Sequence, residues 1–369
     1  MANNKRIVIN AGLSAIAIMR TAYAKVFQSL GWEVFIYNGS EPILDFFKKV
    51  EPSVYMFGSW ELDRATTKAI TMRPNLELIM WAPNWGSLSG DIMLSGHQVL
   101  MASPEEISFV EQIKQTNKLD YCFQYYHQRW MEQTHDSWRN IGVEPIGLPM
   151  AGCLFDYSLG ETNEILSCDG SIVSGHWSYK AINLKKYIYP LANIPGFNLK
   201  VFGYGDWAIA QNIGSIATEN MKHLFASSKV CLSCFEPLSD LHFDCSERIF
   251  KVMSAGGFCV SQSNQTAQRD IVPDGCIVWA EPDNPQDFVD KVIHYASNPE
   301  ERLPFIKNAV NYAYTNGNYF ARAKDMFSHL GWFPEVLALN DVLKNIQGQL
   351  PQIEAAAIRN HERVCEQYA

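Results

Sequence analysis

The sequence predicts an α/β protein with two parallel sheets, and three observations lead to this prediction. Short apolar runs alternate with helical patterns through residues 1–150, and strand–helix alternation at this spacing is typical of a parallel sheet covered by helices. The same alternation starts again at Ser171. With 369 residues the chain is also long for one hydrophobic core and fits two domains of usual size.

In the first half, each expected strand is a short apolar run and each expected helix carries apolar residues every three to four positions. The expected strands are Arg6–Asn10, Glu33–Tyr37, Val54–Phe57, Leu76–Trp81, Val99–Ala102, Tyr121–Gln124 and Pro145–Leu148. The expected helices are Met19–Leu30, Leu62–Met72, Pro104–Thr116 and Gln128–Ile141.

The chain is expected to cross between domains at Leu148–Gly152. Beyond Asn311 the sequence is helical, and Pro334–Gln367 predicts long helices that return to the first domain. The predicted domains are 1–150, 151–333 and the C-terminal helices 334–369.

The segment Glu247–Ser261 is the most informative part of the chain. Its apolar residues first follow the rhythm of a packed helix face. Gly256-Gly257 then supplies the left-handed stop that side chains resist, and Phe258–Val260 continues as a buried strand. Glu247 and Arg248 therefore stand at a helix start, where backbone N–H groups favour anions.

Together with three earlier segments, this one resembles the donor-binding half of GT-B glycosyltransferases. Among these enzymes it is similar to the "glycosyl transferases group 1" type, which includes spore-maturation-like and T4-like phage enzymes. The resemblance covers about residues 170–325, and the order and spacing of the segments carry it. The segments are Ile172–Lys180, Leu199–Gly205, Asn212–Leu232 and Glu247–Ser261.

This resemblance implies two Rossmann-like domains whose parallel sheets face a central cleft, with C-terminal helices returning to the first domain. It implies a hexosyl- or pentosyltransferase that moves a sugar from a nucleotide-diphosphate sugar, above all a UDP-sugar, to a hydroxyl group. It further implies a retaining, metal-independent reaction. The nucleotide sugar is a substrate, and no cofactor or metal is expected. The sequence has no Asp-x-Asp.

One position departs from the pattern of the family that the second half resembles. That family has a ribose-binding Glu where this chain has Lys251. Glu247 lies four residues earlier, on the same helix face, and is the expected substitute. On this view Lys251→Glu restores the family pattern and is tolerated. The role of the family's other carboxylate is open between Glu236, Asp240 and Asp244.

Two cations are candidates for stabilising the departing diphosphate, because electrostatics carries most of such a barrier. Lys180 follows Gly175 at a helix start, and Arg248 offers a bidentate fork. The alternatives are a solvated lysine and a structural ion pair of Arg248 with Glu247 or a neighbour. The resemblance adds Gly175, His176 and Gly203 to the expected donor-binding residues.

On the acceptor side, Gly12 follows the first strand, where GT-B enzymes let the backbone approach donor or acceptor; a plain turn is the alternative. His127 follows an apolar strand, and its pKa range suits proton transfer, with a packed or exposed histidine as the alternative. Trp60, Trp81 and Trp85 are candidates for stacking on a sugar or base, or are core residues.

Composition limits the remaining classes. The net charge is −9 and no polybasic run occurs, which argues against a general nucleic-acid surface. No apolar run reaches the roughly 18–20 residues of a membrane span, and the first residues are a strand, not a signal peptide. The cysteines lack zinc spacing. A reduced cytoplasmic protein is expected, in the host cytoplasm if the source is viral.

The acceptor is open between a hydroxymethylated pyrimidine in phage DNA, a cell-surface polysaccharide and a small molecule. Two other classes also remain. A nucleotide-sugar epimerase has this architecture and needs paired carboxylates facing the sugar. A non-catalytic nucleotide-sugar-binding module keeps the donor motifs and lacks turnover.

Overall fold

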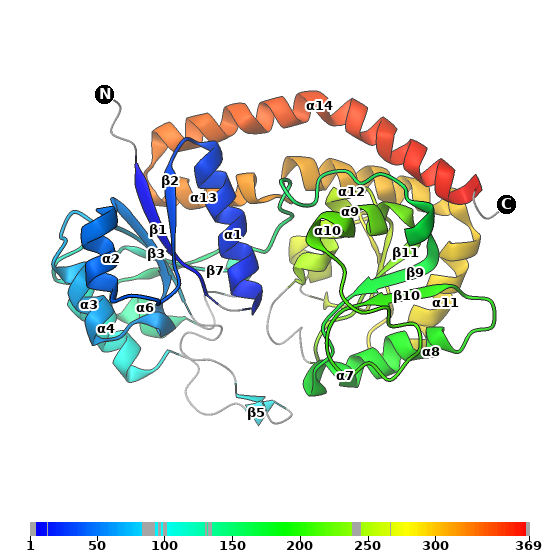
Figure 1. Cartoon of the computed structure of the whole chain (residues 1–369), viewed down its shortest axis with the longest axis horizontal. Helices are drawn as coiled ribbons and strands as arrows, with labels where there is room; N and C mark the ends of the chain where they lie inside the picture. Colours follow the sequence, from blue (N-terminus) through cyan, green and yellow to red (C-terminus); the bar gives the residue numbers. More distant parts are fainter. Residues whose placement is uncertain are drawn as a thin grey trace. The chain divides into compact units, whose positions relative to one another are not determined.

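The computed structural model describes residues 5–12, 14–82, 93–94, 97–98, 102–129, 131, 135–237, 245–265 and 267–366. The chain forms two compact units (Figure 1). The first comprises Met1–Pro149 and Arg322–Asn340, and the second Met150–Ala321 and Asp341–Ala369. The first crossing, at Pro149, falls within the stretch expected from the sequence.

The first unit is a six-stranded sheet in the order β2-β1-β3-β4-β7-β8, with every neighbouring pair parallel. A two-stranded antiparallel piece, β5 with β6, is separate from it. The strands are β1 (Arg6–Asn10), β2 (Glu33–Tyr37), β3 (Val54–Gly58), β4 (Glu77–Trp81), β5 (Met93–Leu94), β6 (His97–Gln98), β7 (Tyr121–Gln124) and β8 (Glu144–Gly147). The helices are α1 (Ser14–Ser29), α2 (Ile43–Val50), α3 (Arg64–Thr71), α4 (Pro104–Lys114) and α6 (Asp136–Asn140), with a 3-10 turn η1 (Ser59–Glu61).

Helices cover both faces of this sheet (Figure 1). In β1, Val8 points to the cluster that includes Phe47, Phe57 and Trp138 under α2, α3 and α4. Ile7 and Ile9 are also fully buried, and alternation along a strand places them on the opposite face. The strands β1, β3 and β4 are mainly apolar and buried because both faces of the sheet are covered there, which is typical of parallel sheets.

The second unit is a five-stranded parallel sheet in the order β10-β9-β11-β12-β13. The strands are β9 (Cys168–Val173), β10 (Leu199–Phe202), β11 (Ser228–Ser233), β12 (Cys259–Ser261) and β13 (Val278–Trp279). The α-helices are α7 (Ser178–Asn183), α8 (Tyr189–Ala192), α9 (Thr218–Ser227), α10 (Glu247–Ser254), α11 (Pro285–Ser297) and α12 (Leu303–Thr315). Short 3-10 and π turns are η2 (Glu164–Leu166), η3 (Leu184–Ile188), η4 (Ala267–Ile271) and η5 (Pro299–Arg302).

Two C-terminal helices, α13 (Tyr319–Leu330) and α14 (Phe333–Glu366), complete the chain. The start of α14 belongs to the first unit, where Glu335 forms an ion pair with Lys5. Its later part belongs to the second unit, where Asn360 Nδ2 donates to Gly160 O at 2.7 Å. The sequence predicts that the helices of 334–369 return to the first domain; in the structure Arg322–Asn340 belongs to the first unit and Asp341–Ala369 to the second. Apolar spacing defines a helix face but not which core that face meets.

Several expected elements differ from those observed. Helix α2 was not expected; it starts after Pro42 without a side-chain cap. The helix expected over Gln128–Ile141 contains α6, which covers only Asp136–Asn140. The strand expected at Val99–Ala102 lies outside the described residues except for Ala102, which is not in a strand. Among the helices of the described residues, none combines the length and the apolar character needed to cross a bilayer.

The double glycine acts as the sequence predicts. Gly256 has φ +79°, and a Cβ there would lie 2.7 Å from Leu159 Cδ1 and 3.2 Å from Ala357 Cβ. Gly257 lets the chain pass close to Phe225, whose carbonyl oxygen would be 2.8 Å from an added Cβ. The glycines therefore set the path of the chain from α10 into β12.

We expect Gly256→Ala to destabilise the second unit more than Gly196→Ala. Both glycines have positive φ, but nothing lies within 4 Å of a Cβ at Gly196. Crowding at Gly256 should add about 1–3 kcal/mol to the backbone strain that the two variants share. Urea unfolding of both variants measures this difference, and equal midpoints would contradict it.

A second expectation concerns pH. Burial and the charge of Arg302 lower the pKa of His361, on α14, to about 4. Its Nε2 lies 3.0 Å from Pro299 O and donates to it. The unfolded chain binds the proton more tightly, so this contribution to stability is complete above about pH 6.5 and is lost as the pH falls toward 4. His361→Gln should flatten the pH dependence of the unfolding midpoint in this window, and an unchanged slope would refute this assignment.

Candidate functional site

The expected donor residues gather at the carboxyl ends of β9, β10 and β11 in the second unit. Ligands of open α/β sheets bind at this edge. The loop after β9 contains Gly175 and His176 and leads into α7, which carries Lys180. Arg248 reaches the same edge from the first turn of α10.

Main-chain carbonyl groups at this edge hold the Arg248 guanidinium. Arg248 Nε donates to Val173 O at 2.8 Å, and Nη1 donates to Cys234 O at 3.3 Å. Val173 ends β9, and Cys234 follows β11. Within the described residues the guanidinium has no carboxylate partner, so the alternative of an ion pair with Glu247 is not what the structure shows. Arg248 therefore brings a positive charge to the edge of the sheet that no described carboxylate pairs with directly, and its Nη2 makes no hydrogen bond to a described residue.

The charges of Lys180 and Arg248 both act on the thiol of Cys234. Burial raises the pKa of the Cys234 thiol to about 12, while the charges of Lys180 and Arg248 lower it. Lys180 is buried, and its Nζ lies 4.9 Å from the centre of the Trp177 ring. The solvated lysine considered from the sequence is therefore not observed. The structure places two cations near one strand end, where they can neutralise an anion together.

Glu247 is paired with the residue that departs from the family pattern. Glu247 Oε2 lies 2.8 Å from Lys251 Nζ, and both side chains are nearly buried. Lys251 Nζ also lies 4.7 Å from the centre of the Tyr157 ring. Burial lowers the pKa of Lys251, but the charge of Glu247 and the contact with Tyr157 outweigh it and raise the pKa above its ordinary value. Lys251 thus fixes one carboxylate oxygen, while Glu247 Oε1 is buried and has no hydrogen-bond partner within the described part of the chain.

The glycines of the expected phosphate site bring two loops into contact. At Gly203, with φ +147°, a Cβ would lie 1.8 Å from Ser174 O. His176 N donates to Tyr204 O at 2.8 Å across the same pair of loops. At Gly175, a Cβ would lie 2.6 Å from the Tyr204 ring. Gly175 and Gly203 therefore let the loops after β9 and β10 pack against each other.

His176 is held by aromatic side chains. Its Nε2 lies 3.0 Å from Tyr189 Oη, and its ring packs on Trp207 at 5.0 Å between centres. Burial and the charge of Lys185 lower its pKa. These contacts give His176 a role in positioning the loop after β9.

The loops after β9 and β10 also contribute an aromatic pair that the sequence analysis overlooked. Trp177 and Tyr204 stack with their ring centres 6.5 Å apart, and Tyr204 is 68% exposed. The only signal in the sequence is an aromatic residue shortly after each of the two glycines. Exposed stacked rings beside a cation are suited to contacts with a sugar or base.

In the first unit, Gly12 and His127 lie where expected, after β1 and β7. Gly12 has φ +68°, and a Cβ there would lie 3.2 Å from Arg20 Nη1. His127 Nδ1 accepts from Arg129 N at 3.4 Å. Trp81 is 1% exposed and packs with Tyr23 and Phe123, so it is a core residue.

Three candidates, Trp85, Asp240 and Asp244, lie outside the described residues. Glu236, the remaining carboxylate, is half-buried after β11. Within the described part of the chain, no three His, Cys, Asp or Glu side chains group as a metal site would require.

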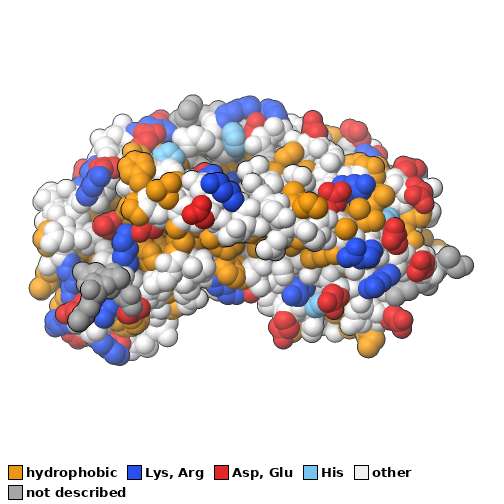
Figure 2. Space-filling model, turned by 90° about the horizontal axis from the view of Figure 1, so that it is seen from above, with side chains coloured by type: hydrophobic (Ala, Val, Ile, Leu, Met, Phe, Trp, Pro, Cys, Tyr) orange, Lys and Arg blue, Asp and Glu red, His pale blue; other side chains and the backbone are white. Residues whose placement is uncertain are grey.

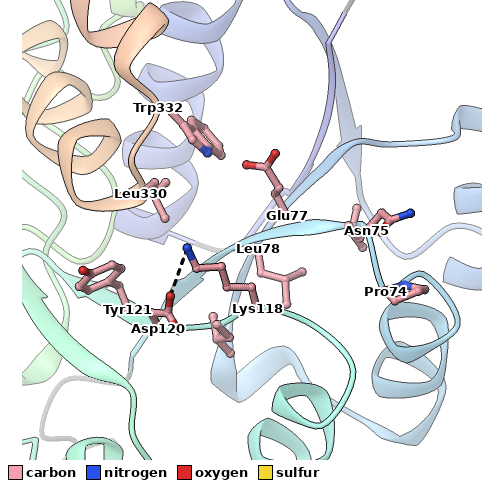
Figure 3. A pocket seen from close by; sticks show the side chains of 11 residues that line it. Pro74, Asn75, Glu77, Leu78, Lys118, Asp120, Tyr121, Leu330 and Trp332 are labelled. Atoms are coloured by element: carbon pink, nitrogen blue, oxygen red, sulfur yellow. Dashed lines mark ion pairs between the residues drawn. The ribbon is translucent and has the colours of Figure 1, made fainter.

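A hollow of about 370 Å³ lies at the opposite edge of the first sheet (Figure 3). It adjoins Glu77 at the start of β4, Tyr121 at the start of β7, and Trp332. Lys118 Nζ and Asp120 Oδ2 form an ion pair there at 3.4 Å. Because ligands of open α/β sheets bind at carboxyl ends, this hollow at the amino ends is not the functional site.

Comparison with known proteins concerns the protein family and the fold. Residues 184–328 match the family model described as "Glycosyl transferase-like". Over these residues the chain is therefore similar to glycosyl transferases. This segment contains α9, α10 and β11 to β13, and it begins just after Lys180. No curated protein matches this sequence.

Three solved structures illustrate the shared fold. Sucrose-phosphate synthase from Thermosynechococcus elongatus aligns with 90% of this chain and 99% of its own, at 11% identity and a TM-score of 0.58. A glycosyltransferase from Rickettsia africae aligns over 94% and 99%, at 12% identity and 0.59. An α-glucosyltransferase in complex with UDP and a 13-mer DNA containing an HMU base aligns over 88% and 99%, at 10% identity and 0.60.

These matches confirm the expected GT-B fold and the resemblance to GT-B glycosyltransferases. The family match also confirms the enzyme class, glycosyltransferase. At identities of 10–12%, the solved structures establish the fold and no more.

The pairing of Lys251 with Glu247 reverses one expectation from the sequence. Lys251→Glu would place two carboxylates one helical turn apart in a nearly buried position. We expect it to cost about 3 kcal/mol or more, the usual cost of breaking a buried pair. Lys251→Arg keeps the charge and is the matched control. Chemical denaturation of both variants checks this, and equal stability of Lys251→Glu and wild type would restore the earlier view.

Proposed function

We propose that this protein transfers a sugar from a UDP-sugar to an acceptor hydroxyl group. The observation that supports the proposal most strongly is the Arg248 guanidinium, held by Val173 O and Cys234 O without a carboxylate partner among the described residues. A cation kept by neutral groups at the carboxyl edge of a sheet is suited to a diphosphate. The matched glycosyl transferase-like segment contains this arginine.

In the proposed reaction, the bond between the anomeric carbon of the sugar and the β-phosphate oxygen breaks, and UDP leaves with the bonding electrons. Arg248 and Lys180 neutralise the charge that develops on the diphosphate, as preorganised groups do best. The acceptor oxygen forms the new bond to the anomeric carbon and gives up its proton. The resemblance to retaining, metal-independent enzymes supports retention of configuration and protein cations in place of a metal.

Glu247 is the proposed partner of the ribose. Its Oε2 is fixed by Lys251, whereas Oε1 is buried with no partner. An unpaired buried carboxylate oxygen costs free energy, and a ribose hydroxyl would remove that cost by donating to it. Lys251 therefore acts on the nucleotide through the orientation of Glu247.

Two kinds of acceptor have support. Similarity in fold to the α-glucosyltransferase bound to DNA with an HMU base supports a hydroxymethylated pyrimidine as one candidate. The net charge of −9 favours a polysaccharide or small molecule. On the face shown in Figure 2, basic and acidic side chains are interspersed, which also suits a weakly charged acceptor. His127, after β7, is the proposed group that takes the acceptor proton.

An epimerase and a binding module remain alternatives, and one assay separates them. The purified protein is incubated with a panel of nucleotide sugars, without and with candidate acceptors. Slow hydrolysis or transfer marks a transferase, isomer formation an epimerase, and binding alone a module. Isomer formation or binding alone would contradict the proposal.

Arg248→Met and Lys180→Ala should each lower kcat/KM by about 10²–10³, the usual effect of losing one partner of a developing anion. Arg269→Met is the matched control, because Arg269 is an exposed arginine of the same unit paired with Asp270. Near-wild-type turnover in Arg248→Met would remove this residue from the site.

Glu247→Ala should weaken UDP binding by about 1.5–3 kcal/mol, the range for a hydrogen bond to a charged group. Calorimetry with UDP and with 2′- and 3′-deoxy-UDP makes the test specific. Wild type should prefer UDP to at least one deoxy analogue, and the variant should lose that preference. Equal affinities in wild type would mean that the ribose is held elsewhere.

A further inference from the structure

Arg20 is a buried arginine at the carboxyl edge of the first sheet, far in the sequence from the donor residues. It lies on α1 and is 1% exposed. Its Nη1 donates to Asn10 O at 2.8 Å, at the end of β1, and to Glu61 Oε1 at 2.7 Å, in the turn after β3. Arg20 therefore joins the ends of two neighbouring strands at the edge where α/β sheets bind ligands.

Most of the hydrogen-bonding capacity of this guanidinium is unused. Arg20 Nε and Nη2 are both buried, and no described residue offers either nitrogen a hydrogen-bond partner. Ser59, in the turn that also holds Glu61, is 0% exposed, and its hydroxyl likewise lacks a partner. Buried polar groups are almost always paired, so several unpaired groups at one strand edge indicate that a ligand supplies the partners.

The charges around Arg20 limit what that ligand is. Glu61 Oε1 already neutralises the guanidinium, and Glu61 Oε2 accepts from Gly58 N at 2.7 Å. A phosphate placed against Nε and Nη2 would face this carboxylate, so the pair offers directed donors without net positive charge. Uncharged oxygens, such as hydroxyl groups, suit it better than an anion.

An aromatic ring completes the arrangement. The Arg20 guanidinium carbon lies 5.7 Å from the centre of the Trp60 ring. Gly58 leaves the space for that ring, since a Cβ there would lie 2.5 Å from it. Trp60 is half-buried, so it is the partly exposed member of the group. A tryptophan beside a fork of donors suits a sugar, which has apolar C–H faces and pairs of adjacent oxygens.

We propose that Arg20, Ser59 and Trp60 form a subsite for an uncharged carbohydrate, the acceptor that bears the reacting hydroxyl. The proposal rests on the proposed function and names the chemical class of its acceptor. Arg20 Nε and Nη2 donate to two neighbouring sugar oxygens, and Trp60 covers an apolar face of the ring. Because the guanidinium is nearly sealed from water, Trp60 moves to admit the sugar. Gly12 serves this subsite, since its missing side chain leaves room for Arg20.

The test is binding of the labelled full-length protein, saturated with UDP, to an array of glycans. The array carries neutral, phosphorylated and carboxylated glycans, and a duplex containing hydroxymethylcytosine is measured beside it. We expect binding to a set of neutral glycans. Arg20→Lys keeps the charge beside Glu61 but lacks the fork, so it should weaken that binding about tenfold or more.

Arg73→Lys is the matched control, because Arg73 also lies over an aromatic ring, that of Phe47 at 5.3 Å, and should bind as wild type does. Trp60→Leu leaves the Arg20–Glu61 ion pair in place, and it provides the test of the subsite if Arg20→Lys does not fold. It too should weaken binding of neutral glycans. Thermal melting reports folding of each variant.

Calorimetry with UDP keeps the two proposals separate. Unchanged UDP affinity in the Arg20 and Trp60 variants, with neutral glycan binding lost, supports the subsite. If the wild-type protein does not bind UDP, the proposed function is refuted instead. The subsite is overturned if only charged glycans or DNA bind, if no glycan binds, or if folded Arg20→Lys and Trp60→Leu bind neutral glycans as wild type does.

Discussion

The candidate donor site depends on one guanidinium held by main-chain carbonyl groups. Arg248 donates to Val173 O and Cys234 O, so its position is set by the ends of β9 and β11 and not by a mobile side chain. Carbonyl groups orient a cation without cancelling its charge, whereas a carboxylate would orient the cation and also cancel its charge. The sheet thus fixes the place of a positive charge and leaves that charge for an anionic ligand.

The molecule uses two other cations in the opposite way. Lys251 and Arg20 each contact a carboxylate directly, at 2.8 Å and 2.7 Å. In the first pair the carboxylate retains an unpaired oxygen, and in the second the guanidinium retains two unpaired nitrogens. One pair therefore presents a hydrogen-bond acceptor and the other presents donors. In both pairs a carboxylate neutralises the cation, whereas no described carboxylate forms an ion pair with Arg248. Similar ion pairs can prepare a protein for different neutral groups of its substrates.

The strands were the most predictable part of the fold, since buried parallel strands are continuous apolar runs with clear ends. β1, β2 and β7 have the bounds that the sequence predicts. Helix α2 escaped notice because its short apolar pattern follows Pro42 without a capping side chain. The division of α14 between two units was equally hidden, because a helical pattern carries no information about which core it joins.

For the candidate site, residue types and order predicted Arg248, Lys180 and Glu247 as donor-binding residues, but not the partners of their side chains. Whether Arg248 meets a carboxylate or a carbonyl depends on the register of β9 and β11, which are distant in sequence. Lys251 stands where the family pattern has a ribose-binding Glu, and its contact with Glu247 fixes one oxygen of that carboxylate. Likewise Gly203 looked like a phosphate-binding glycine, and its close approach to Ser174 shows that it first joins two loops. A motif therefore specifies where the backbone must come close, and only the packed structure shows what it comes close to.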